Sequence, residues 1–110
     1  MSEIDTLKIC AARLKEALND NSLKAVELVE KTGIPKGTIS HYATGRRVPS
    51  RNSAAALAKV LGVNPAWLMG FDVPKYLETP EREKQLLLSY YAQLSPEKQE
   101  SVLNLIKTMI

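Results

Sequence analysis

The sequence predicts an all-α protein, and three kinds of observation support that prediction. Apolar residues recur at helical spacing along most of the 110 residues instead of alternating as they do in a half-buried strand. A capping residue is followed by proline at residues 64–65, 79–80 and 95–96, a pair typical of helix starts. Glycines at 33 and 62 stand where apolar stripes end, as is common at the ends of helices. We therefore expect only helices, organised as a domain over residues 1–70, a linker over 71–78 and a helical hairpin over 79–110.

The first helix is predicted over residues 5–19, where Asp5 or Thr6 would cap its start. One face of this stretch is apolar and consists of Leu7, Cys10, Ala11, Leu14, Ala17 and Leu18. Because Cys10 lies on this face, we expect a buried and unreactive thiol. It is the single cysteine of the chain, so the sequence allows no internal disulfide and no structural zinc site.

Residues 22–53 contain the pattern around which the rest of the chain is organised. Two short helices are expected there, at about 23–31 with Ser22 as cap and at about 35–43 with Pro35 in the first position. Gly33 would end the first of them. Two helices joined by a short turn that contains glycine are the layout of a helix-turn-helix motif. The second helix has the right size to enter the major groove of DNA.

Two more helices complete the predicted domain. The first, capped by Ser50, follows a basic loop and runs to about Leu61. The second is short and begins at residues 64–65, where asparagine would cap it and proline would occupy its first turn. We expect Trp67 in the core rather than as a platform for stacking bases. In the hairpin, helices are expected over about residues 80–94 and 96–110.

Positive charge is concentrated around the predicted helix-turn-helix motif. Residues 1–70 hold 10 Lys and Arg against 6 Asp and Glu, whereas residues 71–110 hold 5 against 6. No acidic residue occurs between Glu30 and Asp72, and this run carries Lys31, Lys36, Arg46, Arg47, Arg51 and Lys59. A surface that lies against phosphates gains from cations and loses from carboxylates. A merely solvated basic face is the alternative, but the run brackets the predicted reading helix, so we favour double-stranded DNA as the partner.

Residues 7–70 resemble the lambda-repressor-like, Cro/CI-type family of helix-turn-helix DNA-binding regulators. The resemblance rests on the segments ELVEKTGIPKGTISHYATGRRVPS and LAKVLGVNPAWLMG. The second segment is similar to the end of the DNA-binding domain in many phage and mobile-element repressors. This resemblance implies a five-helix domain whose third helix reads bases. The tail SYYAQLSPEKQESVLNLI resembles tails of the same family more loosely.

The resemblance also implies which residues contact DNA. Carried over by position, the base-facing sites are Lys36, Gly37 and His41, and Ser40 shares their face of the helix. The phosphate-contacting sites are Thr38, Thr44, Arg46, Arg51 and the amide of Asn52, to which charge alone adds Arg47. The chemistry agrees, because a lysine can donate to guanine O6 or N7, while an arginine on a phosphate adds affinity without sequence information.

This sequence departs from the family pattern at three places. Many members carry glutamine early in the second helix, where this chain has Ala25. The second base-reading place is Gly37, which has no side chain. Many members bury an Arg–Glu pair between the first and third helices, where this chain has Leu18 and Ala43. Replacing both partners of a buried ion pair by apolar residues is often nearly neutral for stability.

Two apolar stripes run along the predicted hairpin and are the candidate dimerisation surface. They consist of Leu87, Tyr90, Tyr91 and Leu94 and of Val102, Leu105, Ile106, Met109 and Ile110. Such stripes either pack back on the first domain or meet their copy in a second subunit. We favour the second subunit, because symmetric dimers are the commonest oligomers.

The function expected from these patterns is that of a transcriptional regulator, a dimeric repressor that reads a near-palindromic operator. The alternative is a protein-interaction module, such as an antitoxin or adaptor, whose partner (an antirepressor or a toxin) binds the last two helices. An enzyme is not expected, because the chain has one His, one Cys and no glycine-rich phosphate loop. We expect no cofactor and no metal. The N-terminus does not resemble a signal peptide and no apolar run reaches membrane-spanning length, so we expect a cytoplasmic protein without membrane contact.

Overall fold

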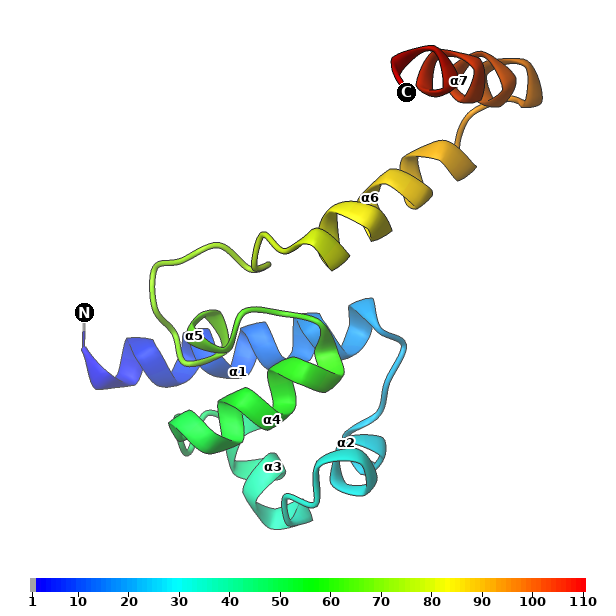
Figure 1. The fold of residues 1–110 in the computed structure, drawn as a ribbon. Coiled ribbons are helices and arrows are strands. Elements are labelled where there is room, and N and C mark those ends of the chain that lie inside the picture. The colour runs from blue at the N-terminus through cyan, green and yellow to red at the C-terminus, as the bar shows by residue number, and fades with distance from the viewer. Residues whose placement is uncertain (1) are drawn as a thin grey trace. The chain divides into compact units, whose positions relative to one another are not determined.

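The computed structural model describes residues 2–110, which form helices and connecting turns with no strand among them (Figure 1). The prediction of an all-α protein is confirmed. The chain divides into two compact units, one that ends at Leu77 and one that runs from Glu78 to Ile110. No helix within residues 2–110 is long and apolar enough to cross a membrane.

The first unit contains the five helices expected for its domain: α1 (Glu3–Asp20), α2 (Ala25–Thr32), α3 (Lys36–Ala43), α4 (Arg51–Leu61) and α5 (Pro65–Leu68). Helix α1 packs against α3 and α5, α2 packs against α3 and α4, and α4 packs against α5. One central core therefore holds all five helices together.

Each of these five helices places one large aliphatic side chain in the core. These side chains are at most 1% exposed, and they are Leu14, Leu28, Ile39, Leu57 and Leu68. Burying a side chain of this size contributes about 1.5–3 kcal/mol to folding. Trp67 and Cys10 are also buried, as the sequence predicts. The short helices α2 and α3 thus owe their stability and orientation to the core, because isolated helices of this length are marginal in water.

Three predicted helix starts are wrong. Each start differs from the prediction by one or two residues, and the predicted capping residues of two of these helices are also wrong. Helix α1 begins at Glu3, and the Ser2 hydroxyl accepts a hydrogen bond from the Asp5 backbone N–H (3.2 Å), so neither Asp5 nor Thr6 is the cap. Ser22 does not cap α2, because it lies in the turn with φ 53°. Pro35 precedes α3 instead of occupying its first position.

The other predicted caps are confirmed. The side chains of Ser50, Asn64, Thr79 and Ser95 each accept a hydrogen bond from a backbone N–H in the first turn of the helix that follows. Each of these bonds satisfies one of the donors that a helix start leaves without an intrahelical partner. Local sequence signals are enough to locate these four helix starts.

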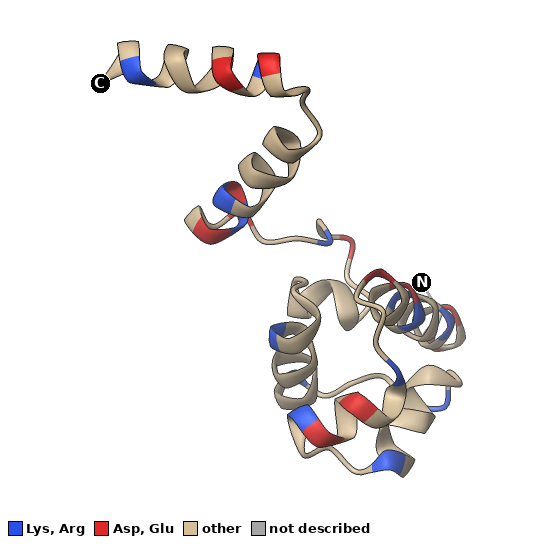
Figure 2. Cartoon of the chain, turned by 90° about the vertical axis from the view of Figure 1, so that its right-hand side faces the viewer, with Lys and Arg blue, Asp and Glu red and all other residues tan. Residues whose placement is uncertain are grey.

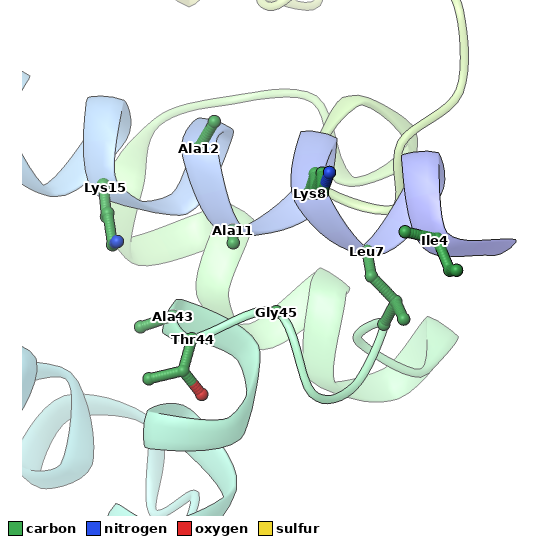
Figure 3. A pocket seen from close by; sticks show the side chains of 9 residues that line it. All are labelled: Ile4, Leu7, Lys8, Ala11, Ala12, Lys15, Ala43, Thr44 and Gly45. Carbon is green, nitrogen blue, oxygen red and sulfur yellow. The ribbon is translucent and has the colours of Figure 1, made fainter.

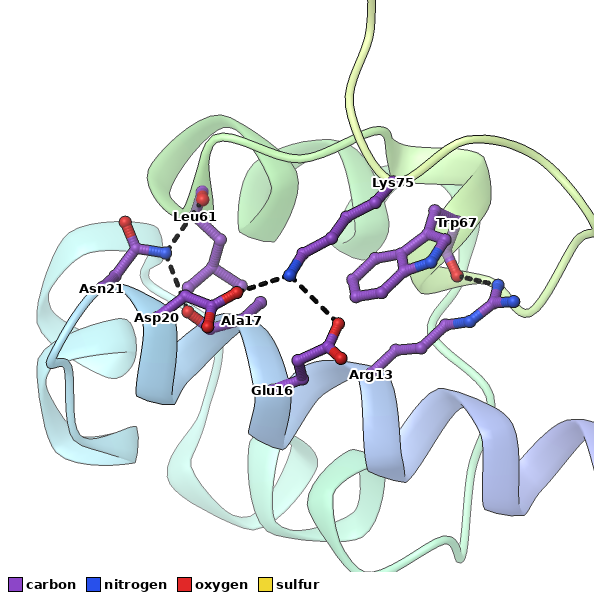
Figure 4. A network of polar contacts seen from close by, with 8 residues as sticks. All are labelled: Arg13, Glu16, Ala17, Asp20, Asn21, Leu61, Trp67 and Lys75. Carbon is purple, nitrogen blue, oxygen red and sulfur yellow. Dashed lines mark hydrogen bonds and ion pairs between the residues drawn. The ribbon is translucent and has the colours of Figure 1, made fainter. Parts of the chain in front are cut away.

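The 71–77 segment, predicted to be part of a linker, packs on the helices of the first unit. Val73 and Tyr76 contact the core, and the backbone carbonyl of Lys75 accepts a hydrogen bond from the Asn64 N–H (2.7 Å). The Lys75 ammonium binds the carboxylates of Glu16 (3.0 Å) and Asp20 on α1 (Figure 4). The first unit consequently continues past Gly70 to Leu77.

The second unit consists of α6 (Pro80–Ala92) and α7 (Pro96–Met109). Neither helix has a buried residue. At the turn between them, the Gln99 side-chain amide donates a hydrogen bond to the backbone carbonyl of Tyr91 (3.0 Å). Helix α6 ends two residues before Leu94, the predicted end, and Leu94 lies in the turn.

Candidate nucleic-acid interface

The turn between α2 and α3 fixes the orientation of α3. Gly33 ends α2 with φ 74°, and its N–H donates to the carbonyl of Val29 (2.9 Å). A residue with a side chain would be strained in this left-handed conformation. On α3, Ile39 and Tyr42 are 1% and 4% exposed, so they hold one face of the helix against the core. The opposite face of α3 is therefore presented outward.

The predicted base-reading residues share this outward side of α3. Lys36, Gly37 and Ser40 are exposed and His41 is half-buried. Their positions differ by one, three, four or five residues, which keeps them on one side of a helix. A Cβ atom added to Gly37 would meet no atom within 4 Å, so packing does not require glycine there. The backbone at this point is open to a close approach by a partner.

The loop after α3 is folded back against the end of the helix. The backbone N–H groups of Arg46 and Arg47 both donate to the carbonyl of His41, at 2.9 and 3.3 Å. The Thr44 hydroxyl donates to the carbonyl of Ser40 (2.8 Å). This hydroxyl would have to give up that bond before it could donate to a phosphate. The side chains of Arg46 and Arg47 remain exposed.

The start of α4 leaves two backbone donors available. The Ser50 side chain and carbonyl accept from the N–H groups of Ser53 (3.2 Å) and Ala54 (2.8 Å). The N–H groups of Arg51 and Asn52 have no acceptor within the described part of the chain. Free N–H groups and the helix dipole favour an anion at such a helix start, and the Arg51 guanidinium adds a positive charge. Thr38, in contrast, is half-buried.

The acidic residues of the first unit are restricted to some of its elements (Figure 2). Its acidic residues lie on α1 and α2 and at Asp72, whereas α3, α4, α5 and the loops between them carry none. The cations in the acid-free part include Lys36, Arg46 and Arg51, which are exposed. The Lys75 ammonium, outside this acid-free part, forms ion pairs with Glu16 and Asp20. The outward side of α3 and the start of α4 therefore form a positively charged surface.

The positions of Leu18 and Ala43 carry apolar contacts in place of charges. Both residues are partly buried and pack against the core. The first and third helices thus carry apolar packing at these two positions.

Burial raises the pKa of the Cys10 thiol on α1, which disfavours the reactive thiolate. No group of three or more His, Cys, Asp or Glu residues in the described chain is arranged to hold a metal ion.

One feature of the first unit was not predicted from the sequence. A groove of about 430 Å³ lies between α1 and the end of α3 (Figure 3), and we call it the α1–α3 groove. Its lining includes Lys8 and Lys15 from α1 and Thr44 from the end of α3. The spacing of the two lysines, seven residues apart, is the signal in the sequence that could have indicated a shared face.

The residues predicted for dimerisation are only partly covered within their own unit. Tyr91, Leu94 and Val102 are half-buried. The others are exposed by 40–99%, and they are Leu87, Tyr90, Leu105, Ile106, Met109 and Ile110. A surface with this much exposed apolar area in so short a segment is typical of an interaction site.

Comparison with known proteins shows the family to which the first unit belongs. The helix-turn-helix family model matches residues 14–68, which is half of the chain. The chain is 40% identical over 58 residues to the HTH-type transcriptional regulator PrtR of Pseudomonas aeruginosa, which corresponds to 53% of this chain and 22% of that protein. It thus spans about a fifth of the length of this curated relative. No solved structure matches the chain significantly.

Proposed function

We propose, from the premise that this chain belongs to the helix-turn-helix family of DNA-binding domains, that it is a sequence-specific transcriptional regulator that binds double-stranded DNA. The observation that carries the proposal is the positively charged surface around α3. The exposed face of α3 has no Asp or Glu, and no residue from Lys31 to Phe71 is acidic. The match of residues 14–68 to the helix-turn-helix family model and the similarity of the chain to one transcriptional regulator support the same function.

In this proposal α3 lies in the major groove and its outward residues read bases. Lys36 donates to guanine, His41 and Ser40 contact base edges, and Gly37 allows the backbone to come close. Arg46, Arg47 and Arg51, together with Thr38, Thr44 and the amide of Asn52, contact phosphates and set the register on the duplex. Ala25 offers no side-chain hydrogen bond at the start of α2, so a larger share of the affinity comes from the cations.

The proposal includes a homodimer held by α6 and α7. Their exposed apolar side chains, such as Leu87, Leu105 and Ile106, support it, because a second copy would remove this surface from water. A dimer would place two copies of α3 about 34 Å apart on a near-palindromic operator. Repression, a cytoplasmic location and a phage or mobile-element origin belong to the same proposal, as the resemblance to phage repressors suggests.

The exposed apolar surface of the second unit also favours a second candidate function. A protein partner, such as an antirepressor or a toxin, could occupy α6 and α7 in place of a second copy. Such a partner would compete with dimerisation and so control DNA binding. The two candidates differ in what binds the tail, and DNA binding by the first unit is common to both.

Backbone amide shifts in the NMR spectrum test where DNA binds. The full chain would be titrated with a duplex of about 20 bp, two turns of DNA, at low salt. We expect the largest shifts in α3, the loop after it and the start of α4, and we expect added salt to reverse them. Shifts confined to α6 and α7, or no shifts, would contradict the proposal. The variant Arg46→Gln, with one phosphate contact fewer, should bind more weakly while it gives the same pattern of shifts.

A further inference from the structure

Two lysines of α1 line the α1–α3 groove without a partner. Lys8 and Lys15 are seven residues apart, so they lie within about 20° of each other around the helix. Both are exposed, and neither forms an ion pair within residues 2–110. No Asp or Glu contributes to the lining of the groove. The groove therefore carries two positive charges that have no ion-pair partner within residues 2–110.

The acidic residues in the second half of α1 are turned away from these lysines. Glu16 and Asp20 lie about 80–120° from Lys8 around the helix. Both carboxylates bind Lys75 in the 71–77 segment (Figure 4). Their charge is thus compensated on a different side of α1, and the groove keeps its positive potential.

The groove adjoins the loop that is proposed to contact phosphates. Thr44 and Gly45 line it, and Arg46 follows directly along the chain. Gly45 brings the loop close to α1, since a Cβ atom there would lie 3.6 Å from the carbonyl oxygen of Leu7. Ala43, the last residue of α3, contributes to the lining without a charge (Figure 3). A DNA backbone that contacts Arg46 would therefore also pass along the surface of α1.

We infer that Lys8 and Lys15 bind phosphates of the DNA backbone that flanks the half-site read by α3. This inference rests on the proposed function and adds a second set of phosphate contacts, on α1. The small side chains of Ala11 and Ala12 keep the surface between the lysines low, which lets a sugar-phosphate backbone reach both ammonium groups. An acidic protein segment is the competing occupant of this groove, and the experiment separates the two.

The test compares the full chain with its K8Q/K15Q variant on DNA selected by the wild-type protein. Dissociation constants would be measured at 50 and 200 mM salt on one duplex with long flanks and on one trimmed at the half-sites. Each lost phosphate contact lowers the slope of log affinity against log salt concentration by about 0.9. Between 50 and 200 mM salt, the affinity of the wild type for the long duplex should therefore fall about tenfold more than that of the variant. On the trimmed duplex the two proteins should behave alike. Circular dichroism establishes that the variant is folded.

The matched control is K59Q/K84Q, which removes the same charge elsewhere. Lys59 lies at the end of α4 away from Arg51, about 12 Å farther along the helix axis, and Lys84 lies in the second unit. The control should keep the wild-type slope. A K8Q/K15Q slope equal to that of the wild type or of the control would overturn the inference while the selected DNA still upholds the proposed function. Shifts of the Ala12 and Ala43 amides with poly-glutamate but not with DNA would also overturn it.

Discussion

The Lys75 ammonium lies 3.0 Å from the Glu16 carboxylate, and this ion pair attaches the 71–77 segment to α1. The same ammonium binds Asp20 and lies 5.3 Å from the centroid of the Trp67 ring. Arg13 lies 5.2 Å from the same centroid and donates to the carbonyl oxygens of Trp67 and Phe71, each at 2.8 Å. Two cations of the first unit thereby hold α5 and the segment that follows it against α1.

Replacing Lys75 by Met should loosen the 71–77 segment without unfolding the five-helix core. The carboxylates of Glu16 and Asp20 are 53% and 44% exposed, so we expect a loss of about 1 kcal/mol, as for exposed ion pairs. Amide hydrogen exchange at Val73 and Lys75 should accelerate, while exchange in α4 stays slow. Equal acceleration in both places would show that the segment is part of the global unfolding unit. Lys59→Met is the control, because Lys59 is exposed and forms no ion pair with residues 2–110.

The contribution of Lys75 to stability should depend on pH in one direction. Burial disfavours the ammonium, but hydrogen bonds to Asp20 and Glu16 outweigh this effect and raise the pKa of Lys75 above its ordinary value of 10.5. A raised pKa in the folded state means that the contribution is complete below pH 10.5 and is lost as the pH rises through the folded value. Urea unfolding should therefore give a constant difference between the wild type and Lys75→Met from pH 7 to 10. A difference that shrinks within that range would contradict this.

Replacing Gly70 by Ala should destabilise the first unit. Gly70 has φ 91°, and a Cβ atom there would lie 3.1 Å from the Thr6 methyl carbon and 3.2 Å from the Cys10 sulfur. The left-handed backbone alone costs about 1–2 kcal/mol, and the two tight contacts add to it. Gly62→Ala is the control, because Gly62 has φ 71° and no atom within 4 Å of its Cβ position. The free energy of unfolding in urea should fall more for Gly70→Ala, and an equal or smaller loss would refute the packing argument.

Substitutions at Lys36 and Arg46 should affect DNA binding differently. Lys36→Ala should cost about 1–3 kcal/mol at one base pair and relax the preference there, because a base contact is lost. Arg46→Ala should weaken all duplexes alike and reduce the salt slope by about 1. Competition binding with single-base variants of the selected DNA distinguishes the two effects. If Lys36→Ala weakened selected and random DNA equally, its assignment to base reading would be wrong.

Charge placed on α7 should prevent the proposed dimer. Leu105 is 61% exposed, so Leu105→Asp would leave a single protein folded but would bury a charge between two copies. We expect sedimentation equilibrium to give a dimer for the wild type and a monomer for this variant. Lys107→Gln, which also changes the charge by −1, is the control for the change of charge on the same helix. A wild-type monomer at high micromolar concentration would remove the dimer from the proposal.

Local signals in the sequence were enough for the fold class and for most of the helix starts. Ser50, Asn64, Thr79 and Ser95 act within their own first turn, so the sequence shows them directly. The start of α2 was misplaced because Ser22 is a good capping residue that a left-handed backbone excludes from this role. Its actual first turn is stabilised by the Glu27 carboxylate, which accepts from the Lys24 N–H (3.2 Å).

Features that depend on distant residues were not visible in the sequence. Lys75 meets Asp20 across 55 positions, and no pattern within a window of helical length connects them. The α1–α3 groove depends likewise on how α1 packs against α3, so Lys8 and Lys15 had no evident role before the packing was known. The candidate interface itself could be anticipated, because the buried pair Ile39 and Tyr42 sets its face and the charge run brackets it.

Selection of randomised duplex DNA by the full chain, at two salt concentrations, tests the central claim most directly. The claim is that α3 and the cations around it read a DNA sequence. We expect enrichment of an inverted repeat whose half-sites are centred about one helical turn apart. At the higher salt concentration, binding should be weaker but the preferred sequence should be the same. Weak, salt-sensitive binding with no enriched sequence at either concentration would contradict the claim.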